Sequence, residues 1–132
     1  MIAGIGNDVA DIRRVRKILS RHPRRFPARL LTDTESREFA ARGFAPSYLA
    51  GRIAAKEALA KALRGGLRAP MTWRGVSVLS GEGGDGDERG APSFCFSPPL
   101  AEHLRERGVS ACHLSIAHDG DYAAAVVVAE KT

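Results

Sequence analysis

A short apolar run opens the chain and is followed by a pattern with helical spacing. Residues 2–9 are mostly apolar and interrupted by glycines, which predicts a strand that ends on Asp8. Asp11 then precedes an apolar stripe at helical spacing and predicts a capped helix over residues 12–20. Pro23 ends this helix, because the residue before a proline avoids helical backbone angles.

Two further helices are predicted from the residues that begin and end them. Thr32 and Glu35 have the spacing of a capping box, which predicts a helix over residues 33–42. A longer stretch rich in alanine and leucine, residues 47–64, predicts a helix that stops at Gly65.

The second half of the chain predicts one helix and several strands. Ser97 is placed to cap the helix, which ends at Gly108. Residues 80–91 hold five glycines and four acids, which predicts a solvated loop whose acids would repel phosphate. The predicted strands are 73–79, 93–96, 111–117 and 122–129, the last two forming a hairpin. Because strands and helices are mixed, we predict an α+β fold with an antiparallel sheet packed with helices.

Length and composition narrow the class of protein. The chain has 132 residues, of which 44% are hydrophobic and 27% charged, so we expect one globular domain over residues 1–132. Its longest apolar run, residues 122–129, is too short to span a membrane, and its first residues lack a secretory signal. Cys95 and Cys112 have neither zinc-site nor disulfide-framework spacing, so we expect reduced thiols and a cytoplasmic protein.

Positive charge is concentrated in one segment. The formal net charge is +5, yet residues 13–29 alone carry eight basic side chains and no acidic one. They are Arg13, Arg14, Arg16, Lys17, Arg21, Arg24, Arg25 and Arg29. Such a cluster attracts an acidic partner, which charge alone leaves open between nucleic acid, a phosphorylated ligand and an acidic protein surface. A solvated helix face without a partner is the alternative.

Two carboxylates and a lysine are candidates for chemistry. Asp8 lies in a glycine-bearing strand that a ligand can approach closely, although a turn or cap aspartate is the simpler interpretation. Glu57 lies at the border of the buried stripe of the long helix, and Lys61 follows at i+4, the spacing of a surface ion pair. Together, two carboxylates and a lysine would suit a magnesium ion that bridges phosphates.

The predicted hairpin carries a second group of polar residues. His113 and Ser115 point to the same face of their strand, where they could contact a polar ligand or simply face solvent. Ser115, His118 and Asp119 could also be drawn as a catalytic triad, but no nucleophile elbow surrounds the serine.

Four segments together resemble one family. They are GIGNDVADIRR (4–14), RFPARLLTDTE (25–35), YLAGRIAAKEALAKAL (48–63) and CHLSIAHDGDYAAAVVVAE (112–130). In this order they resemble the holo-[acyl-carrier-protein] synthases, the short bacterial 4′-phosphopantetheinyl transferases. The resemblance implies the fold of those enzymes, Mg²⁺ as cofactor, and coenzyme A and an apo acyl carrier protein as substrates. It also implies a homotrimer with active sites at subunit interfaces, and neither nucleic acid nor a membrane as partner.

The resemblance assigns roles to residues that match the family's motifs. Asp8 and Glu57 match the magnesium ligands, and Lys61 matches the lysine on the coenzyme A pyrophosphate; these three form the implied catalytic set. The further coenzyme contacts that it implies are His113, Ser115 and Arg52. The residues that it implies for docking the carrier protein are Arg13, Arg14, Arg21 and Arg24.

The expected activity is transfer of the 4′-phosphopantetheine arm of coenzyme A to a serine of apo acyl carrier protein, in fatty acid biosynthesis. Adenosine 3′,5′-bisphosphate is the other product. The competing hypothesis is a small nucleic-acid-binding module that uses residues 13–29 on phosphate backbones, which leaves the carboxylates unexplained. A structural subunit without catalysis is disfavoured, because both candidate metal ligands are present.

Overall fold

The computed structural model describes residues 1–81 and 91–132, so most of the predicted loop 80–91 lies outside the described residues. The elements follow one another as β1 (Ile2–Asp11), α1 (Ile12–Arg21), α2 (Arg25–Leu30), α3 (Asp33–Ala41), α4 (Pro46–Ala62), β2 (Val76–Leu79), β3 (Ser93–Phe96), α5 (Pro98–Glu106), β4 (Val109–Asp119) and β5 (Tyr122–Lys131).

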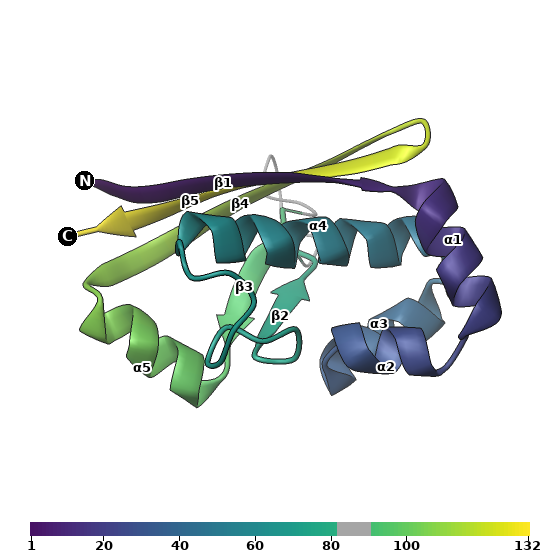
Figure 1. The fold of residues 1–132 in the computed structure, drawn as a ribbon, viewed down its shortest axis with the longest axis horizontal. Coiled ribbons are helices and arrows are strands. Elements are labelled where there is room, and N and C mark those ends of the chain that lie inside the picture. Colours follow the sequence, from purple (N-terminus) through teal and green to yellow (C-terminus); the bar gives the residue numbers. More distant parts are fainter. Residues whose placement is uncertain (82–90) are drawn as a thin grey trace.

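Two antiparallel sheets form the β part of the fold. The larger has the strand order β1-β5-β4, and β2 and β3 pair separately. Helix α4 runs along one face of the larger sheet, with α1, α2 and α3 at one end of the molecule and α5 at the other (Figure 1). The predicted α+β class with an antiparallel sheet packed with helices is confirmed.

The pleat of the larger sheet separates an inner face from an outer face. On β1, Gly6 and Ala10 are buried and Asp8 is partly buried, and all three lie on the face toward α4. Ile5 and Val9 alternate with them and are exposed on the outer face. The side chain of Asp8 therefore points toward the long helix rather than away from it.

The predicted elements are present, with changes at their ends. Strand β1 continues to Asp11, so Asp8 lies inside the strand and not at its end, because pairing with β5 extends as far as Tyr122. Strand β2 begins only at Val76, three residues later than predicted. Helix α2 was not predicted, since Pro27 lies inside it and its polar residues are nearly all arginines.

The predicted helix caps are confirmed. Asp11 accepts a hydrogen bond from the backbone nitrogen of Arg13 at 2.9 Å. Thr32 and Glu35 form a reciprocal capping box at the start of α3. Ser97 accepts from the backbone nitrogen of Leu100 at the start of α5. Each cap satisfies a backbone donor that the first turn of a helix leaves free.

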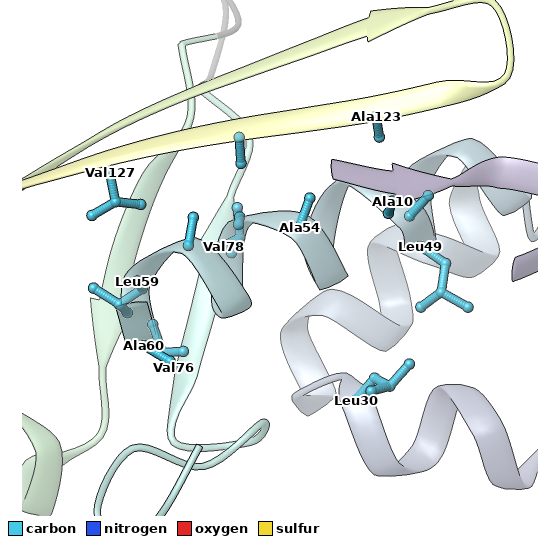
Figure 2. Close-up of a cluster of buried hydrophobic side chains, with 14 of the residues drawn as sticks. Ala10, Leu30, Leu49, Ala54, Leu59, Ala60, Val76, Val78, Ala123 and Val127 are labelled. Carbon is cyan, nitrogen blue, oxygen red and sulfur yellow. The ribbon is translucent and has the colours of Figure 1, made fainter. Parts of the chain in front are cut away.

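Helix α4 is buried on nearly every side. The sequence predicted an apolar stripe, whereas the structure leaves few positions of this helix exposed, because the larger sheet covers one side and β2 and α1 cover others. Figure 2 shows side chains of α4 among those of both sheets and of α2. The core on this helix is therefore made mostly of small side chains, which allow close packing.

The backbones of β1 and α4 approach each other at two glycines. A Cβ placed on Gly4 would clash with the carbonyl oxygen of Ala62, and one placed on Gly6 would clash with that of Ala58. The Gly6 Cβ would also lie 2.7 Å from the backbone nitrogen of Ala62. Only glycine permits this approach, which brings the strand residue Asp8 next to the helix.

Within the described part of the chain, no helix combines the length and the apolar character that crossing a lipid bilayer requires.

Candidate active site

Asp8 and Glu57 come from different elements and meet on the inner face of the larger sheet. Asp8 is paired with Ala125 on β5, which fixes the strand against the helix below it. Glu57 is on the turn of α4 that faces this strand, close enough for a hydrogen bond between the two carboxyl groups. The structure therefore brings together two acids that are separated by most of the first half of the chain.

Lys61 joins this pair from the next turn of α4. Its Nζ donates to Oδ1 of Asp8 at 2.9 Å and to the backbone oxygen of Asn7 at 3.0 Å. Its side chain is 56% exposed, while that of Asp8 is 13% exposed. Lys61 thus pairs across the strand with Asp8 and not along the helix with Glu57, and its ammonium remains open to a ligand in solvent.

The environment of Glu57 favours its protonated form. Burial, together with the hydrogen bond and the negative charge of Asp8, raises the pKa of Glu57 to about 7, and Lys61 opposes this rise. Two carboxyl groups this close share a proton unless a cation compensates them. The pair is therefore a site at which positive charge would be stabilised.

This environment predicts a pH-dependent stability in metal-free buffer. Because the pKa of Glu57 is higher in the folded chain than its ordinary value of 4.5, the folded state binds the proton more tightly and loses stability as pH rises toward 7. We expect Glu57→Gln to gain Tm over the unsubstituted chain by ~3 °C or more at about pH 8 and by little at about pH 5. Calorimetric melting with a chelator measures this, and an equal difference at both pH values would contradict it.

A cleft opens beside the two carboxylates. It has a volume of about 410 Å³ and lies between β1, α1, α2 and α4. Four of its lining residues are charged and the other eight are apolar. The lining residues are Asp8, Val9, Ala10, Asp11, Arg14, Val15, Ile18, Phe26, Leu30, Ile53, Glu57 and Trp73. Three of the four charged residues are acids, so an anionic ligand would bind here only together with a cation, while an uncharged arm would match the apolar lining.

The donor set fits a magnesium ion. Asp8 and Glu57 supply hard carboxylate oxygens, which Mg²⁺ prefers, and their shared negative charge lacks compensation by any cation other than Lys61 among the contacts described. No cluster of three His, Cys, Asp or Glu residues occurs in residues 1–81 and 91–132. A magnesium ion here would therefore complete its coordination with water and ligand phosphates, which is its usual behaviour.

The arginines that were predicted to dock a carrier protein differ in their surroundings. Arg14 lines the cleft. Arg13 instead pairs with Asp11 at 2.9 Å and with Asp121 at 3.7 Å, so part of its charge is compensated within the chain. Arg21 and Arg24 are exposed at the end of α1 and in the link to α2.

Arg52, predicted to contact coenzyme, does not lie in the same cleft as Asp8. Its side chain is 7% exposed, stacks over the ring of Tyr48 at 4.1 Å and donates to Oγ of Ser80 at 2.8 Å. Its Nε is buried without a hydrogen-bond partner. Arg52 lines a second cleft of about 420 Å³ near the start of α4, together with His118.

His113 and Ser115 lie on the outer face of the larger sheet. Both are exposed, and His113 Nε2 is 2.6 Å from Oε1 of Glu130. His118 has the opposite parity on β4 and contacts the backbone oxygen of Ser47 under the sheet at 3.1 Å. Ser115 and His118 therefore face opposite sides of one strand, so the alternative triad with Asp119 is wrong.

The apolar part of the cleft was not predicted from the sequence. Phe26 and Leu30 come from the unpredicted helix α2, and Trp73 lies in the link before β2, where a strand was expected. The one signal that could have indicated it is that Trp73 is the only tryptophan of the chain.

Comparison with known proteins identifies the family of the chain. Residues 4–127 match the family model of the 4′-phosphopantetheinyl transferase superfamily. The holo-[acyl-carrier-protein] synthase of Aromatoleum aromaticum is 46% identical over 131 residues, which cover 99% of each chain.

Solved structures give the same result. The crystal structure of holo-[acyl-carrier-protein] synthase from Neisseria meningitidis matches with a TM-score of 0.90 and 37% identity, over 99% of this chain and 100% of that one. The Bacillus anthracis enzyme, solved in complex with CoA (3′,5′-ADP), matches with a TM-score of 0.76 and 32% identity, over 100% of this chain and 99% of that one. The chain therefore belongs to the holo-[acyl-carrier-protein] synthases of the 4′-phosphopantetheinyl transferase superfamily.

Proposed function

We propose that the cleft beside Asp8 and Glu57 is where this holo-[acyl-carrier-protein] synthase transfers 4′-phosphopantetheine from coenzyme A to a serine of apo acyl carrier protein, as a step of fatty acid biosynthesis. The observation that carries the assignment is the pair of adjacent acids, Asp8 and Glu57, on the inner face of the sheet, with Lys61 bonded to Asp8. Two carboxylates would repel a diphosphate, so a diphosphate can bind beside them only with a cation. Mg²⁺ is the cation that most commonly accompanies phosphates in such sites.

The residues of the cleft have separable roles in this reaction. The seryl oxygen bonds to the β-phosphorus of coenzyme A, the bond from that phosphorus to the bridging oxygen breaks, and adenosine 3′,5′-bisphosphate leaves while the seryl proton is released to water. Asp8 and Glu57 would hold the magnesium ion, which supplies positive charge against the charge that grows on the phosphate oxygens. Lys61 places an ammonium beside the same oxygens, and the apolar wall positions the uncharged arm.

The direct test mixes the protein with coenzyme A, Mg²⁺ and an apo acyl carrier protein and weighs the carrier by mass spectrometry. We expect the carrier to gain one phosphopantetheine, and a chelator to stop the gain. An unchanged carrier mass, combined with tight and strongly salt-dependent binding of DNA or RNA, would instead support the nucleic-acid-binding alternative.

We also propose that the protein is a homotrimer whose active sites lie between subunits. The outer face of the larger sheet presents Ile5, Val9 and Val126 at 63, 61 and 45% exposure, an apolar surface of the kind that a second copy covers. His113 and Ser115 lie on this same face, across the sheet from Asp8. They can reach a coenzyme bound at Asp8 only if they come from another copy of the chain.

This arrangement predicts complementation between two inactive variants. Glu57→Gln lacks the metal carboxylate, whereas His113→Ala lacks the coenzyme contact of the neighbouring subunit. When the two are unfolded together and reassembled in equal amounts, about a quarter of the sites should combine an intact Glu57 with an intact neighbouring His113. Transfer activity should therefore return to about a quarter of that of the unsubstituted protein. If the mixture stays as inactive as its components, both residues act in the same subunit.

The basic residues of α1 and the link to α2 are proposed as the surface that docks the carrier protein. Arg14 lines the cleft, and Arg21 and Arg24 are exposed at the end of α1 and in the link to α2. Acyl carrier proteins of this family are acidic, so opposite charge would steer them to this surface. Arg13 is the weakest member, because Asp11 and Asp121 already compensate it.

Reversal of one charge tests this surface. We expect Arg21→Glu to raise KM for the carrier roughly 5-fold or more and to leave KM for coenzyme A unchanged, because Arg21 lies outside the cleft. Arg105→Glu makes the same change of charge on α5, at the other end of the molecule (Figure 1), and should leave both constants unchanged. Equal effects of the two variants would show that only overall charge matters.

A further inference from the structure

A buried ion pair lies behind the wall of the cleft. Lys56 on α4 and Glu35 on α3 are both completely buried, and Nζ of Lys56 is 2.6 Å from Oε1 of Glu35. Burial lowers the pKa of Lys56, and the adjacent carboxylate opposes that effect. Neither side chain lines the cleft, and neither has a role in the reaction described above.

The ammonium of Lys56 has three acceptors for its three hydrogens. Besides Glu35, it donates to the backbone oxygen of Leu30 at 2.7 Å and to that of Trp73 at 2.7 Å. A buried lysine that is satisfied this completely has a single position. The two carbonyl groups that it holds come from the end of α2 and from the link before β2, which are far apart in the sequence.

Glu35 connects the same point to two further elements. Its Oε1 accepts from the backbone nitrogen of Thr32 at 2.9 Å, and its Oε2 accepts from that of Val78 on β2 at 2.9 Å. The pair therefore links α2, α3, α4 and β2. Replacing a buried ion pair by hydrophobic residues is often neutral for stability, but here it would also leave buried backbone groups without partners. What the pair holds in place therefore explains it better than the attraction of its two charges.

The residues held by Lys56 are residues of the cleft wall. Leu30 and Trp73 line the same cleft as Glu57, the residue that follows Lys56 on α4. The Trp73 link precedes β2, which begins only at Val76, and backbone bonds from Gly75 to Thr72 and from Ser97 to Gly75 also hold it. Lys56 adds a single buried donor that holds the carbonyl groups of two wall residues far apart in the sequence.

We propose that Lys56, with Glu35, is a positioning residue that sets the apolar wall of the cleft against the catalytic carboxylates. It touches neither the metal nor the substrate and acts through the carbonyl groups of Leu30 and Trp73. The inference extends the proposed function, because the wall is where the uncharged arm of the substrate would lie.

Two variants separate positioning from stability. Lys56→Met removes the ammonium and leaves Glu35 buried without its partner, so it should be strongly destabilised. Lys56→Met combined with Glu35→Gln removes both charges at nearly constant volume and should recover much of that stability. In neither variant do the carbonyl groups of Leu30 and Trp73 have a charged donor to hold them.

The first readout needs no activity. Trp73 is the only tryptophan, so the fluorescence of the protein reports on the cleft wall directly. We expect the emission of the double variant to shift to longer wavelength and its quenching by acrylamide to increase, with an unchanged far-ultraviolet circular dichroism spectrum. Leu100→Ala, a cavity variant on α5 at a residue that does not line the cleft, is the control that loses stability without changing the emission.

The second readout is the division between KM and kcat. A displaced wall weakens binding, so KM for coenzyme A should rise ~10-fold in the double variant while kcat changes less. A variant that is only less stable has fewer folded molecules and loses kcat at unchanged KM, as we expect of Leu100→Ala. The proposal is overturned if emission and KM of the double variant return to the original values together with stability. Failure of the proposed function would appear separately, as an unsubstituted chain that transfers nothing.

Discussion

Glu57→Gln should reduce kcat for transfer to the carrier protein by ~1,000-fold or more at saturating Mg²⁺, while the protein remains folded. The amide has nearly the size and shape of the carboxyl group but cannot supply the negative charge that a magnesium ion requires. Because Glu57 is partly buried beside Asp8, no other carboxylate in the described part of the chain is placed to replace it. Mass spectrometry of the carrier over time measures the rate, and thermal melting confirms the fold.

The matched control is Glu106→Gln, which makes the same change at an exposed position at the end of α5. It should leave the rate unaltered. Titration calorimetry of Mg²⁺ in the presence of coenzyme A completes the test, since only Glu57→Gln should lose the binding of the metal. A normal transfer rate in Glu57→Gln would remove this residue from the metal site.

Gly6→Ala should cost about 3 kcal/mol or more of the free energy of unfolding, and so lower Tm by ~10 °C or more. The added methyl group would overlap the carbonyl oxygen of Ala58 and approach the nitrogen of Ala62, both of which are backbone atoms of a buried helix that cannot move aside. Separation of β1 from α4 also separates Asp8 from Glu57, so transfer activity should fall even below the new Tm.

Gly65→Ala is the control for this prediction. A Cβ on Gly65 has no atom within 4 Å, and its backbone angles are those of an ordinary residue. We therefore expect its Tm to change by less than ~2 °C. If Gly6→Ala were equally harmless, the strand and the helix would not be in the close contact described here.

The sequence was sufficient for features that depend on local chemistry. Thr32 and Glu35 indicated the start of α3, and Asp11 that of α1, because a helix cap is made by residues a few positions apart. It also named Asp8, Glu57 and Lys61 as candidates, but their positions alone left a cap aspartate and a surface ion pair as simpler interpretations, and their proposed roles come from the resemblance to the family.

Features that depend on packing between distant segments could not be predicted from the sequence. Lys56 and Lys61 lie in the same helix with similar neighbours, yet one side chain is fully buried and the other is 56% exposed. What distinguishes them is whether α3 or solvent faces each side of the helix, and helical spacing does not contain this information. The placement of His113 across the sheet from Asp8 likewise depends on strand register, which only the assembled sheet defines.

The strand that carries Asp8 is hydrogen-bonded along its length to β5, which the ribosome makes more than a hundred residues later, with Ile2 opposite Glu130. During synthesis, β1 can pack against α4 as soon as α4 has been made, but it cannot pair with β5 until residues 122–131 have emerged. Pairings over such a sequence distance form slowly. We therefore expect the pairing that fixes Asp8 in its final position to form only after β5 has been made.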